Sequence, residues 1–217
     1  MNTTQMSQWR GQFGREYTQR NSLTLEQLDA LYRRNYGLSR KELNQRFLAH
    51  VPRNARILEV GCNIGMQLSM LWDLGFHSLS GIEIQHDALK RAKFRVPEIL
   101  LAEASALEIP FADRSFDLVF TSGVLIHIAP DDLQRVMYEI YRCSKKFIWG
   151  FEYHSPELVG VDYRGSADLL WKMNYAQAFL DEFDDLRLLR CEHLSYLDNP
   201  NIDCMFLMEK SASAANS

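Results

Sequence analysis

The sequence predicts an α/β protein with a Rossmann-like, doubly wound and mostly parallel seven-stranded sheet. From residue 55 onward, apolar runs alternate with amphipathic segments, a pattern typical of parallel strands covered by helices on both faces. Only five residues, DNPNI, separate the last two apolar runs, and this spacing permits a C-terminal antiparallel hairpin. With 217 residues, 47% of them hydrophobic, the chain can form one domain with a sizeable core.

Two capping boxes predict helices near the N-terminus. They pair Thr24 with Gln27 and Ser39 with Glu42. A capping box satisfies the first free N–H groups of a helix, so each pair marks a helix start. We therefore expect residues 1–54 to form a mostly helical cap or lid.

The core of the predicted domain covers residues 55–210. Its strands are expected in ARILEV, SLSGIEI, EILLAE, SFDLVFTS, KFIWGFEY, LRLLRCEHLSYL and DCMFLMEK. The segment GSADLLWKMNYAQAFLDEF, residues 165–183, is expected to form one helix before the hairpin. Residues 211–217 are small and polar, and we expect this tail to be disordered.

Charge limits the classes of partner. The net charge is −4, yet residues 1–56 carry ten Lys or Arg against four Asp or Glu. A basic cap over an acidic body can attract an anionic substrate, although solvated helix faces are the simpler explanation of the basic residues. The overall acidity argues against generic nucleic-acid binding, which normally requires a basic excess.

Targeting signals and cysteine spacing indicate the compartment. The N-terminus lacks the apolar segment of a signal peptide, and no apolar run approaches the ~18 residues of a membrane span. We therefore expect a cytoplasmic protein with no membrane partner. The four cysteines form no C-x-x-C pair, so the sequence predicts reduced thiols, no disulfide framework and no metal site.

The stretch ILEVGCNIG, residues 57–65, ends an expected strand with an acid and two glycines. In an open α/β sheet, this first strand-to-helix turn makes the closest contact with a ligand. Gly61 would let the backbone approach the ligand, and Gly65 would let the next helix begin close to the strand. Glu59 would accept hydrogen bonds from a cationic or polar group. The motif is neither G-x-G-x-x-G nor G-K-[ST], which disfavours a dinucleotide or a P-loop phosphate.

A second acid, Glu83, ends the next expected strand eighteen residues after Gly65. Nucleoside-binding α/β proteins place a carboxylate at this point, where it accepts hydrogen bonds from the ribose hydroxyls. With ASALEIPF after the third strand, these motifs resemble the class I S-adenosylmethionine-dependent methyltransferases over residues 55–153. The resemblance implies S-adenosylmethionine as cofactor, with Glu83 on its ribose.

The same resemblance assigns further residues to cofactor binding. It implies that Cys62 and Asn63, with the flanking glycines, surround the methionine part and that Ile84 packs on the adenine. Ser105 stands where many members carry an Asp for the adenine amino group. The fourth-strand motif FDLVFTSGVLIHI implies contacts beside the sulfonium, made by Thr121, Ser122 and Gly123.

Both ends of the chain extend the resemblance to a narrower group. The segments WRGQFGREYTQRN, VLIHIAPDDLQRVMYEIYRCSKKFI and EYHSPELVGVDYRGSADLLWKMNYAQAFLDEF resemble the pseudaminic acid biosynthesis-associated methylases. This implies a role in sugar biosynthesis and an acceptor of the nonulosonic-acid type. Met173 and Asn174 replace the Arg-Asp pair of typical members, a difference that bears on acceptor specificity.

An aromatic stripe near the N-terminus predicts a lid. Trp9, Phe13 and Tyr17 recur at i, i+4 and i+8, and Arg20 follows Tyr17 at i+3. Such a stripe usually packs into a core. Ending in a guanidinium, it could instead cover the cofactor and clamp the cofactor carboxylate. We therefore predict that Trp9, Tyr17 and Arg20 contact the cofactor.

The polar, aromatic loop EYHSPELVGVDYRG follows the fifth expected strand and predicts the acceptor site. Glu152, Tyr153 and His154 form the predicted catalytic group, and Tyr163 and Arg164 the predicted substrate-binding pair. An amine acceptor only has to arrive unprotonated, whereas a hydroxyl needs a base, for which His154 is the local candidate. A carboxylate acceptor needs no base, and Arg164 would hold it.

Three functions stay open from the sequence. The first is methyl transfer to a small polar metabolite, such as a nonulosonic-acid-type sugar or a related amino-bearing compound. The second is methylation of a flagellar or surface protein, and the third is a non-catalytic cofactor-binding module that assists a partner. The sequence predicts neither the acceptor atom nor the oligomeric state.

Overall fold

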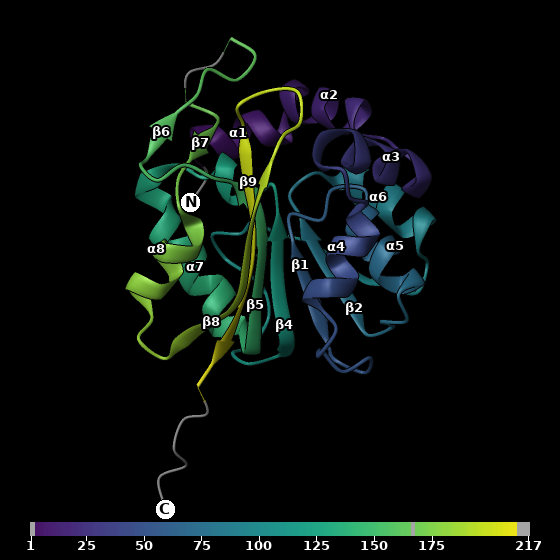
Figure 1. Cartoon of the computed structure of the whole chain (residues 1–217). Coiled ribbons are helices and arrows are strands. Elements are labelled where there is room, and N and C mark those ends of the chain that lie inside the picture. Colours follow the sequence, from purple (N-terminus) through teal and green to yellow (C-terminus); the bar gives the residue numbers. More distant parts are fainter. Residues whose placement is uncertain (1–2, 166–167, 212–217) are drawn as a thin grey trace, which may run out of the picture.

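The computed structural model describes residues 3–165 and 168–211, which form three layers around a central sheet (Figure 1). Within them the main sheet has seven strands in the order β3-β2-β1-β4-β5-β9-β8. All neighbouring pairs are parallel except those that involve β9, which is antiparallel to β5 and to β8. The predicted doubly wound sheet with a C-terminal hairpin is therefore confirmed.

The elements have the following bounds. The strands of the main sheet are β1 (Ile57–Val60), β2 (Leu79–Glu83), β3 (Leu100–Glu103), β4 (Phe116–Ser122), β5 (Ser144–Tyr153), β8 (Leu186–Ser195) and β9 (Ile202–Lys210). A separate short pair consists of β6 (Val159–Gly160) and β7 (Trp171–Lys172). The helices are α1 (Thr4–Arg10), α2 (Gln12–Arg20), α3 (Leu25–Tyr36), α4 (Arg40–Phe47), α5 (Met66–Asp73), α6 (His86–Arg95), the 3-10 helix η1 (Leu125–His127), α7 (Pro130–Cys143) and α8 (Tyr175–Glu182). Among the described residues, no helix has the length and apolar character needed to cross a membrane.

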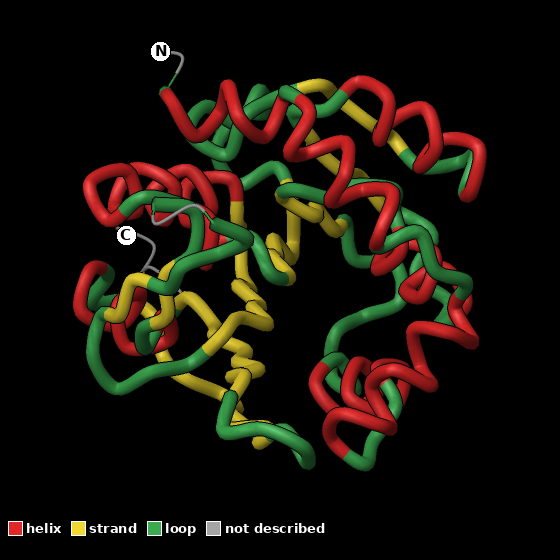
Figure 2. Tube along the Cα trace, turned by 90° about the horizontal axis from the view of Figure 1, so that it is seen from above, coloured by secondary structure: helices red, strands yellow, loops and turns green. Residues whose placement is uncertain are grey.

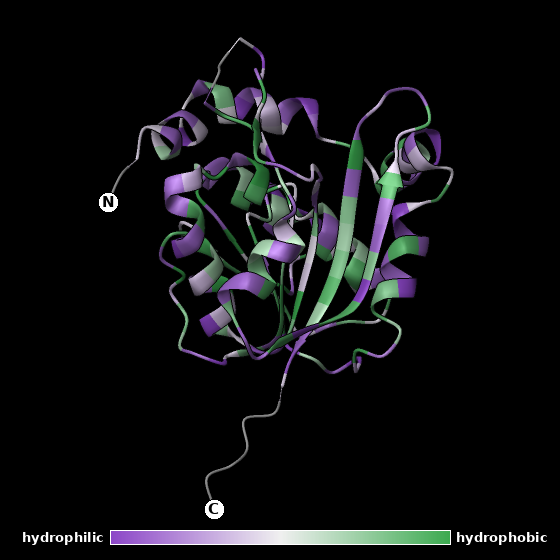
Figure 3. Ribbon diagram, turned by 60° about the vertical axis from the view of Figure 1, so that its left-hand side comes forward, coloured by the Kyte–Doolittle hydropathy of each residue, from purple (hydrophilic) through white to green (hydrophobic). Residues whose placement is uncertain are grey.

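A hydrophobic core lies on each face of the sheet, so β1 and β2 are buried along their whole length. Helices α4, α5 and α6 supply one core, and α7 and α8 supply the other. The side chains of β9 alternate between the two: Met205 and Leu207 join the first core, Phe206 and Met208 the second. Figure 3 shows hydrophobic residues along the long strands in the middle of the molecule.

The strand order reverses between β1 and β4. The chain builds β2 and β3 outward from β1 and then returns to place β4 on the other side of β1. In open α/β sheets, ligands bind outside the carboxyl ends of the strands at this reversal. The topology therefore brings the turns after β1 and β4 to the expected ligand site.

In its described residues, 3–54, the N-terminal cap contains four helices, α1 to α4, and both predicted capping boxes are present at α3 and α4. The aromatic stripe does not lie on one continuous helix, because the chain leaves helical geometry at Gly11, between α1 and α2. Gly14 allows the two short helices to pack closely, since a Cβ there would lie 1.8 Å from the backbone oxygen of Trp9.

The helix predicted over residues 165–183 is wrong in its first half. The helix α8 begins only at Tyr175, where the Asn174 side chain accepts a hydrogen bond from the Gln177 N–H at 3.1 Å. Before this cap, the chain forms β7, which pairs with β6. The N-cap preference of Asn and the strand pairing together override the helical periodicity of the segment.

The predicted tail lies almost wholly outside the described residues. Of residues 211–217, the structure describes only Ser211, whose N–H donates to the Asp185 carbonyl oxygen at 2.7 Å. The hairpin thus ends beside α8 before the undescribed part of the chain begins.

Candidate active site

A cavity of about 380 Å³ opens at the carboxyl ends of the central strands, beneath the N-terminal helices. Figure 2 looks from above onto this end of the molecule, where those helices run across the tops of the strands. A volume of this size is typical of small-molecule sites. The cavity lies at the predicted reversal of strand order.

Most of the residues predicted to form the site meet in this cavity. The predicted residues that line it are Trp9, Tyr17, Glu59, Gly61, Cys62, Asn63, Glu83, Ile84, Ser105, Ser122, Gly123, Glu152 and Tyr153. The predicted residues that are not part of its lining are Arg20, Gly65, Thr121, His154, Tyr163 and Arg164.

The turn after β1 requires glycine at two positions. Gly61 and Gly65 both have φ of +72°, which favours glycine. A Cβ at Gly61 would also lie 2.7 Å from the Val124 side chain, and one at Gly65 would lie 3.1 Å from Ala92 Cβ. Gly61 therefore brings the turn against the loop after β4, while Gly65 packs the start of α5 against α6.

Glu83 is held by backbone N–H groups at the end of β2. Its Oε1 accepts hydrogen bonds from Ile84 (2.8 Å) and Gln85 (2.9 Å), and its Oε2 accepts one from Asn63 (3.0 Å). Burial nevertheless raises the pKa of this carboxyl above its usual value. The hydrogen bonds fix the carboxylate at the cavity wall, where a ribose diol could reach it.

Glu59 presents an unsatisfied oxygen to the same cavity. The residue is only 3% exposed, and its Oε2 has no hydrogen-bond partner among the described residues. Burial raises the pKa of Glu59 well above its usual value, although the buried Arg40 guanidinium nearby opposes the shift. An unpaired buried carboxylate oxygen is costly, so the site favours a ligand that brings a cationic or N–H donor.

The N-terminal helices close the cavity from above. The Asn63 side chain donates to Thr18 Oγ1 on α2 at 3.0 Å, which ties this helix to the turn after β1. The Trp9 ring lies with its centroid 4.5 Å from His127 and 5.2 Å from Tyr17. Arg20, predicted to clamp the cofactor, instead pairs with Glu16 at 3.8 Å.

Glu152 anchors the loop that follows β4. Its carboxylate accepts N–H hydrogen bonds from Val124 (3.2 Å) and Ile126 (3.4 Å), and the Thr121 side chain also hydrogen-bonds to it. Burial raises the pKa of Glu152 to about 7. This carboxylate therefore positions the loop that carries Ser122 and Gly123 into the cavity.

Asp203, on β9, contributes an acid that the sequence did not single out. Its Oδ2 accepts hydrogen bonds from the hydroxyl groups of Tyr36 and Tyr196, the latter at 3.2 Å. Its Oδ1 is buried and has no partner in the described part of the chain. Burial raises the pKa of Asp203 to about 6. Asp203, Tyr36, Tyr153 and Tyr196 all line the cavity, so this wall offers one free acceptor atom among aromatic rings.

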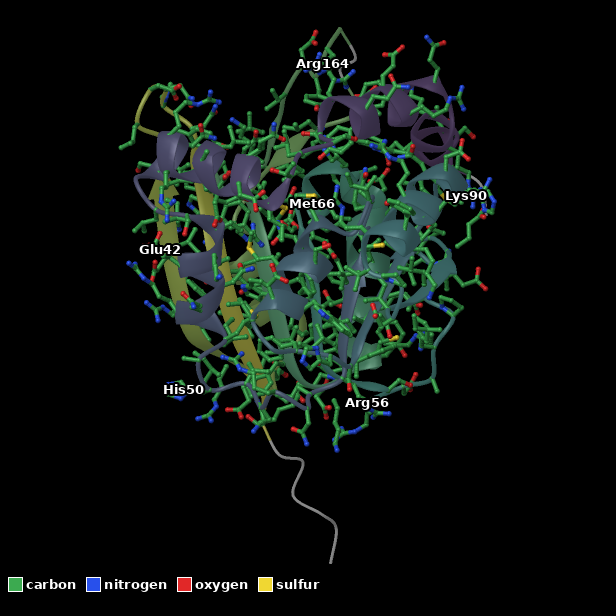
Figure 4. All side chains as sticks on the ribbon, turned by 90° about the vertical axis from the view of Figure 1, so that its right-hand side faces the viewer. Glu42, His50, Arg56, Met66, Lys90 and Arg164 are labelled. Carbon is green, nitrogen blue, oxygen red and sulfur yellow. The ribbon has the colours of Figure 1, made fainter. Side chains whose placement is uncertain are left out.

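The rest of the loop after β5 lies outside the cavity lining. The His154 ring packs against His193, with centroids 4.3 Å apart. Tyr163 packs against Phe13 (5.9 Å) and His127 (5.4 Å), so it supports the aromatic cover from behind. Figure 4 places Arg164 at the outer tip of this loop.

His127 is a neutral, buried wall residue. Its Nδ1 lies 2.7 Å from the Leu169 carbonyl oxygen, which fixes Nδ1 as the donor. Burial lowers the pKa of the imidazole to about 4. The ring therefore packs beneath Trp9 as an uncharged group at neutral pH.

Comparison with known proteins connects this geometry to a domain type. A family model described as a methyltransferase domain matches residues 58–147. An uncharacterized methyltransferase from Synechocystis is 31% identical over 90 residues, which make up 42% of this chain and 42% of that protein. The chain spans about two fifths of the length of the curated relatives that it matches.

Solved structures share the fold across nearly the whole chain. The 1,6-didemethyltoxoflavin-N1-methyltransferase of Burkholderia thailandensis, crystallised with 1,6-didemethyltoxoflavin and S-adenosylhomocysteine, has a TM-score of 0.71 at 13% identity, covering 93% of this chain and 87% of that chain. The [4+2]-cyclase SpnF has a TM-score of 0.64 at 14% identity, covering 88% and 98%. At such identities the likeness shows the fold alone. A methyltransferase domain is therefore indicated by the match to the family model, together with the geometry of the site.

Residues 58–147 match a methyltransferase domain, and the chain shares the fold of S-adenosylmethionine-dependent methyltransferases. The residues of this methyltransferase domain fit its cofactor. S-adenosylmethionine carries a sulfonium, an ammonium, a carboxylate and a ribose diol, and the cavity presents buried carboxyl groups at Glu59 and Glu83 to its cationic and hydroxyl groups. Among the described lining residues there is no lysine or arginine, and the acids are Glu59, Glu83, Asp132, Glu152 and Asp203. This acidic lining suits a cationic ligand.

Sequence reasoning missed one wall of the methyltransferase domain's cavity. The helix α3 supplies Leu28, Tyr32 and Tyr36, and the hairpin supplies Tyr196 and Asp203. The amphipathic pattern of α3 shows that one face is buried but not which surface covers it. The contribution of the hairpin depends on β9 lying beside β5, a pairing that motif spacing does not show.

Proposed function

We propose that this chain transfers the methyl group of S-adenosylmethionine to a small metabolite that carries an amine or hydroxyl group. The observation that carries the proposal is the Oδ1 atom of Asp203, which has no hydrogen-bond partner among the described residues and lies in the same cavity as Glu59 and Glu83. The β1 and β2 wall would then hold the cofactor, and the wall that carries Asp203 would offer a buried acceptor atom to the second substrate. A hydrogen-bond donor on that substrate would satisfy it.

The cofactor would occupy the side of the cavity formed by β1 and β2. Glu83 would accept the ribose hydroxyls, and Glu59 would face the cationic methionine part. Ile84 and Ser105 line the region proposed for the adenine, and Ser122 and Gly123 the region beside the sulfonium. S-adenosylmethionine supplies an activated methyl group, so the protein chiefly has to orient the two substrates.

The acceptor would lie against the tyrosine wall and Asp203. Tyr153 faces the cavity there, and Glu152 holds the adjacent loop in place. A neutral amine needs no base, whereas the proton of a hydroxyl has to leave, and Asp203 and Glu152 are the carboxylates on this side. Their raised pKa values, about 6 and about 7, bring both within the range of useful bases near neutral pH.

The N-terminal helices that line the cavity favour a small molecule over a protein acceptor. Helices α1, α2 and α3 all contribute side chains to the lining. A protein acceptor has to reach past these helices, whereas a metabolite can enter through the opening of the cavity. The Burkholderia thailandensis methyltransferase that shares this fold was crystallised with a small molecule and S-adenosylhomocysteine, which also supports this choice.

An amino-bearing sugar is the acceptor class that we propose first. The resemblance to the pseudaminic acid biosynthesis-associated methylases points to nonulosonic-acid-type sugars, and an amino or hydroxyl substituent on such a sugar suits Asp203. Because the described cavity lining lacks lysine and arginine, the sugar's carboxylate would have to point toward the opening. The acidic lining therefore favours transfer to nitrogen or to a sugar hydroxyl over transfer to a carboxylate.

Labelled S-adenosylmethionine and a size-fractionated cell extract test this proposal. At a low concentration of S-adenosylmethionine, we expect label in the small-molecule fraction with the wild-type protein and much less label with Glu83→Ala. The control is Glu103→Ala. Glu103 lies at the end of β3, directly opposite Glu83 in the strand register, but its side chain is exposed and contacts His86. Label in protein would replace the proposal by a protein methyltransferase. Tight cofactor binding with no label in any fraction would indicate a non-catalytic module.

A further inference from the structure

The hairpin carries a cluster of metal-ligating side chains outside the cavity. Cys191, His193 and Cys204 each offer one ligand atom, and these three atoms lie within 4.8 Å of one another. The two Sγ atoms are 3.2 Å apart. Cysteine and histidine are the usual ligands of zinc in proteins.

Strand register brings these residues together although their spacing in the sequence shows no zinc pattern. His193 pairs directly with Cys204, and Cys191 pairs with Phe206, so all three lie on one face of the hairpin. This is the face that packs toward α7 and α8, since Phe206 belongs to that core. A C-x-H pair on β8 and a single Cys on β9 do not resemble C-x-x-C, which is why the sequence predicted no metal site.

We propose that Cys191, His193 and Cys204 bind a zinc ion at this end of the hairpin. In tetrahedral coordination with Zn–S bonds of ~2.3 Å, two cysteine sulfurs lie about 3.8 Å apart. The sulfurs therefore need to separate by only ~0.6 Å from their 3.2 Å contact. Two thiolates would also neutralise the charge of the ion. This site is separate from the cavity and does not depend on the proposed function.

His154 lies outside the group of three whose ligand atoms are within 4.8 Å of one another, and it is the candidate that we propose for the fourth ligand. It follows β5, and its N–H donates to the Ile202 carbonyl oxygen at 2.8 Å, which holds it next to the hairpin. Its Nδ1 is buried and has no hydrogen-bond partner among the described residues. Its ring centroid lies 4.3 Å from that of His193. A Cys₂His₂ set closes the coordination of a structural zinc ion without water.

A disulfide between the two cysteines explains the arrangement less well. An S–S bond is ~2.05 Å long, so the sulfurs would have to approach by more than 1 Å. It would also make no use of the two imidazoles beside them. His193 is exposed and Cys191 is half-buried, so a metal ion can reach the cluster from solvent, whereas Cys204 is buried.

Zinc at this place would fix the hairpin against β5. Cys204 pairs with Glu152 on β5 and adjoins Asp203 in the chain. Both of these acids face the cavity. We therefore expect the ion to stabilise the wall that carries Asp203 rather than to take part in chemistry.

Cobalt substitution and metal analysis test the zinc site in the whole, reduced chain. We expect the wild type to bind zinc with a stoichiometry of one and to give thiolate-to-cobalt charge-transfer absorption with Co²⁺. Cys204→Ser and His193→Ala should lose zinc and the absorption band. Cys143→Ala is the matched control, since Cys143 is a buried cysteine elsewhere in the core. Because His193 is exposed, His193→Ala tests the site even if Cys204→Ser fails to fold.

The outcomes separate zinc binding from other uses of the thiols. If the reduced wild type binds neither ion, or if His193→Ala binds zinc as the wild type does, the proposal is overturned. A mass loss of two hydrogens on oxidation, together with no zinc uptake after reduction, would identify a redox pair instead. His154→Ala should weaken zinc binding and change the cobalt d–d spectrum, and an unchanged spectrum would exclude His154 as the fourth ligand.

Discussion

Tyr36 on α3 donates its hydroxyl hydrogen to Asp203 on β9, and this bond joins the N-terminal cap to the C-terminal hairpin across the cavity. Tyr196 donates to the same Oδ2 atom at 3.2 Å. Both tyrosines thus hold the carboxylate in one orientation and leave Oδ1 without a partner among the described residues. An acid held in this way can recognise a donor group without moving when that group arrives.

Asp203→Asn should separate acceptor binding from cofactor binding. The loss of a hydrogen bond to a charged group costs about 1.5–3 kcal/mol, so we expect the acceptor KM to rise roughly 10- to 150-fold. The Kd of S-adenosylhomocysteine, measured by calorimetry, should change little. Asp198→Asn is the control, because Asp198 lies in the exposed hairpin turn beside Asn199. An unchanged acceptor KM in Asp203→Asn would place the acceptor elsewhere in the cavity.

Glu83→Ala should weaken the binding of S-adenosylhomocysteine by about 1.5–3 kcal/mol, since the ribose loses a fixed, charged acceptor. Glu103→Ala should keep wild-type affinity, because Glu103 is exposed and outside the cavity lining. Calorimetry on the two variants measures the difference directly. Equal affinities would show that Glu83 does not bind the cofactor. Asp203→Asn would still test the proposed acceptor side independently.

The sheet and the cavity wall at the ends of β1 and β2 could be predicted from the sequence because both depend on local patterns. Glu59, Gly61 and Glu83 each stand at the end of a predicted strand, and parallel strands bring such ends to one edge. The capping boxes of α3 and α4 are local as well. These features follow from the residues within a few positions of each site.

The cavity wall formed by Tyr36, Tyr196 and Asp203 could not be predicted, because it depends on pairing between distant segments. Asp203 reaches the cavity only because β9 inserts between β5 and β8. Tyr36 meets it 167 residues away in the chain. The same insertion brings Cys204 beside His193 and keeps His154 next to the hairpin. The sequence showed a hairpin but gave no register.

Glu152→Gln should change how stability depends on pH. Burial raises the pKa of Glu152 from 4.5 to about 7, so between these values the folded state binds more protons than the unfolded state. The unfolding free energy of the wild type therefore falls as pH rises through this window, by up to ~3 kcal/mol from this group. In Glu152→Gln, the unfolding free energy should not show the part of this fall that comes from Glu152. Urea titrations of both proteins from pH 4.5 to 8 measure it, and parallel curves would contradict the buried, protonated state.

Thr18→Val should loosen the cover of the cavity. The Thr18 hydroxyl accepts the hydrogen bond from the Asn63 side chain at 3.0 Å and is the polar tie of α2 to the turn after β1. Residues 9–21 should exchange amide hydrogens rapidly without cofactor and slowly with it, because closing requires this contact and the packing of Trp9 on His127. In Thr18→Val we expect less protection with cofactor and an affinity about fivefold weaker, a loss of ~1 kcal/mol. Gln19→Ala, exposed on the same helix, should behave as wild type. Equal protection of the segment with and without cofactor would make it a fixed part of the core.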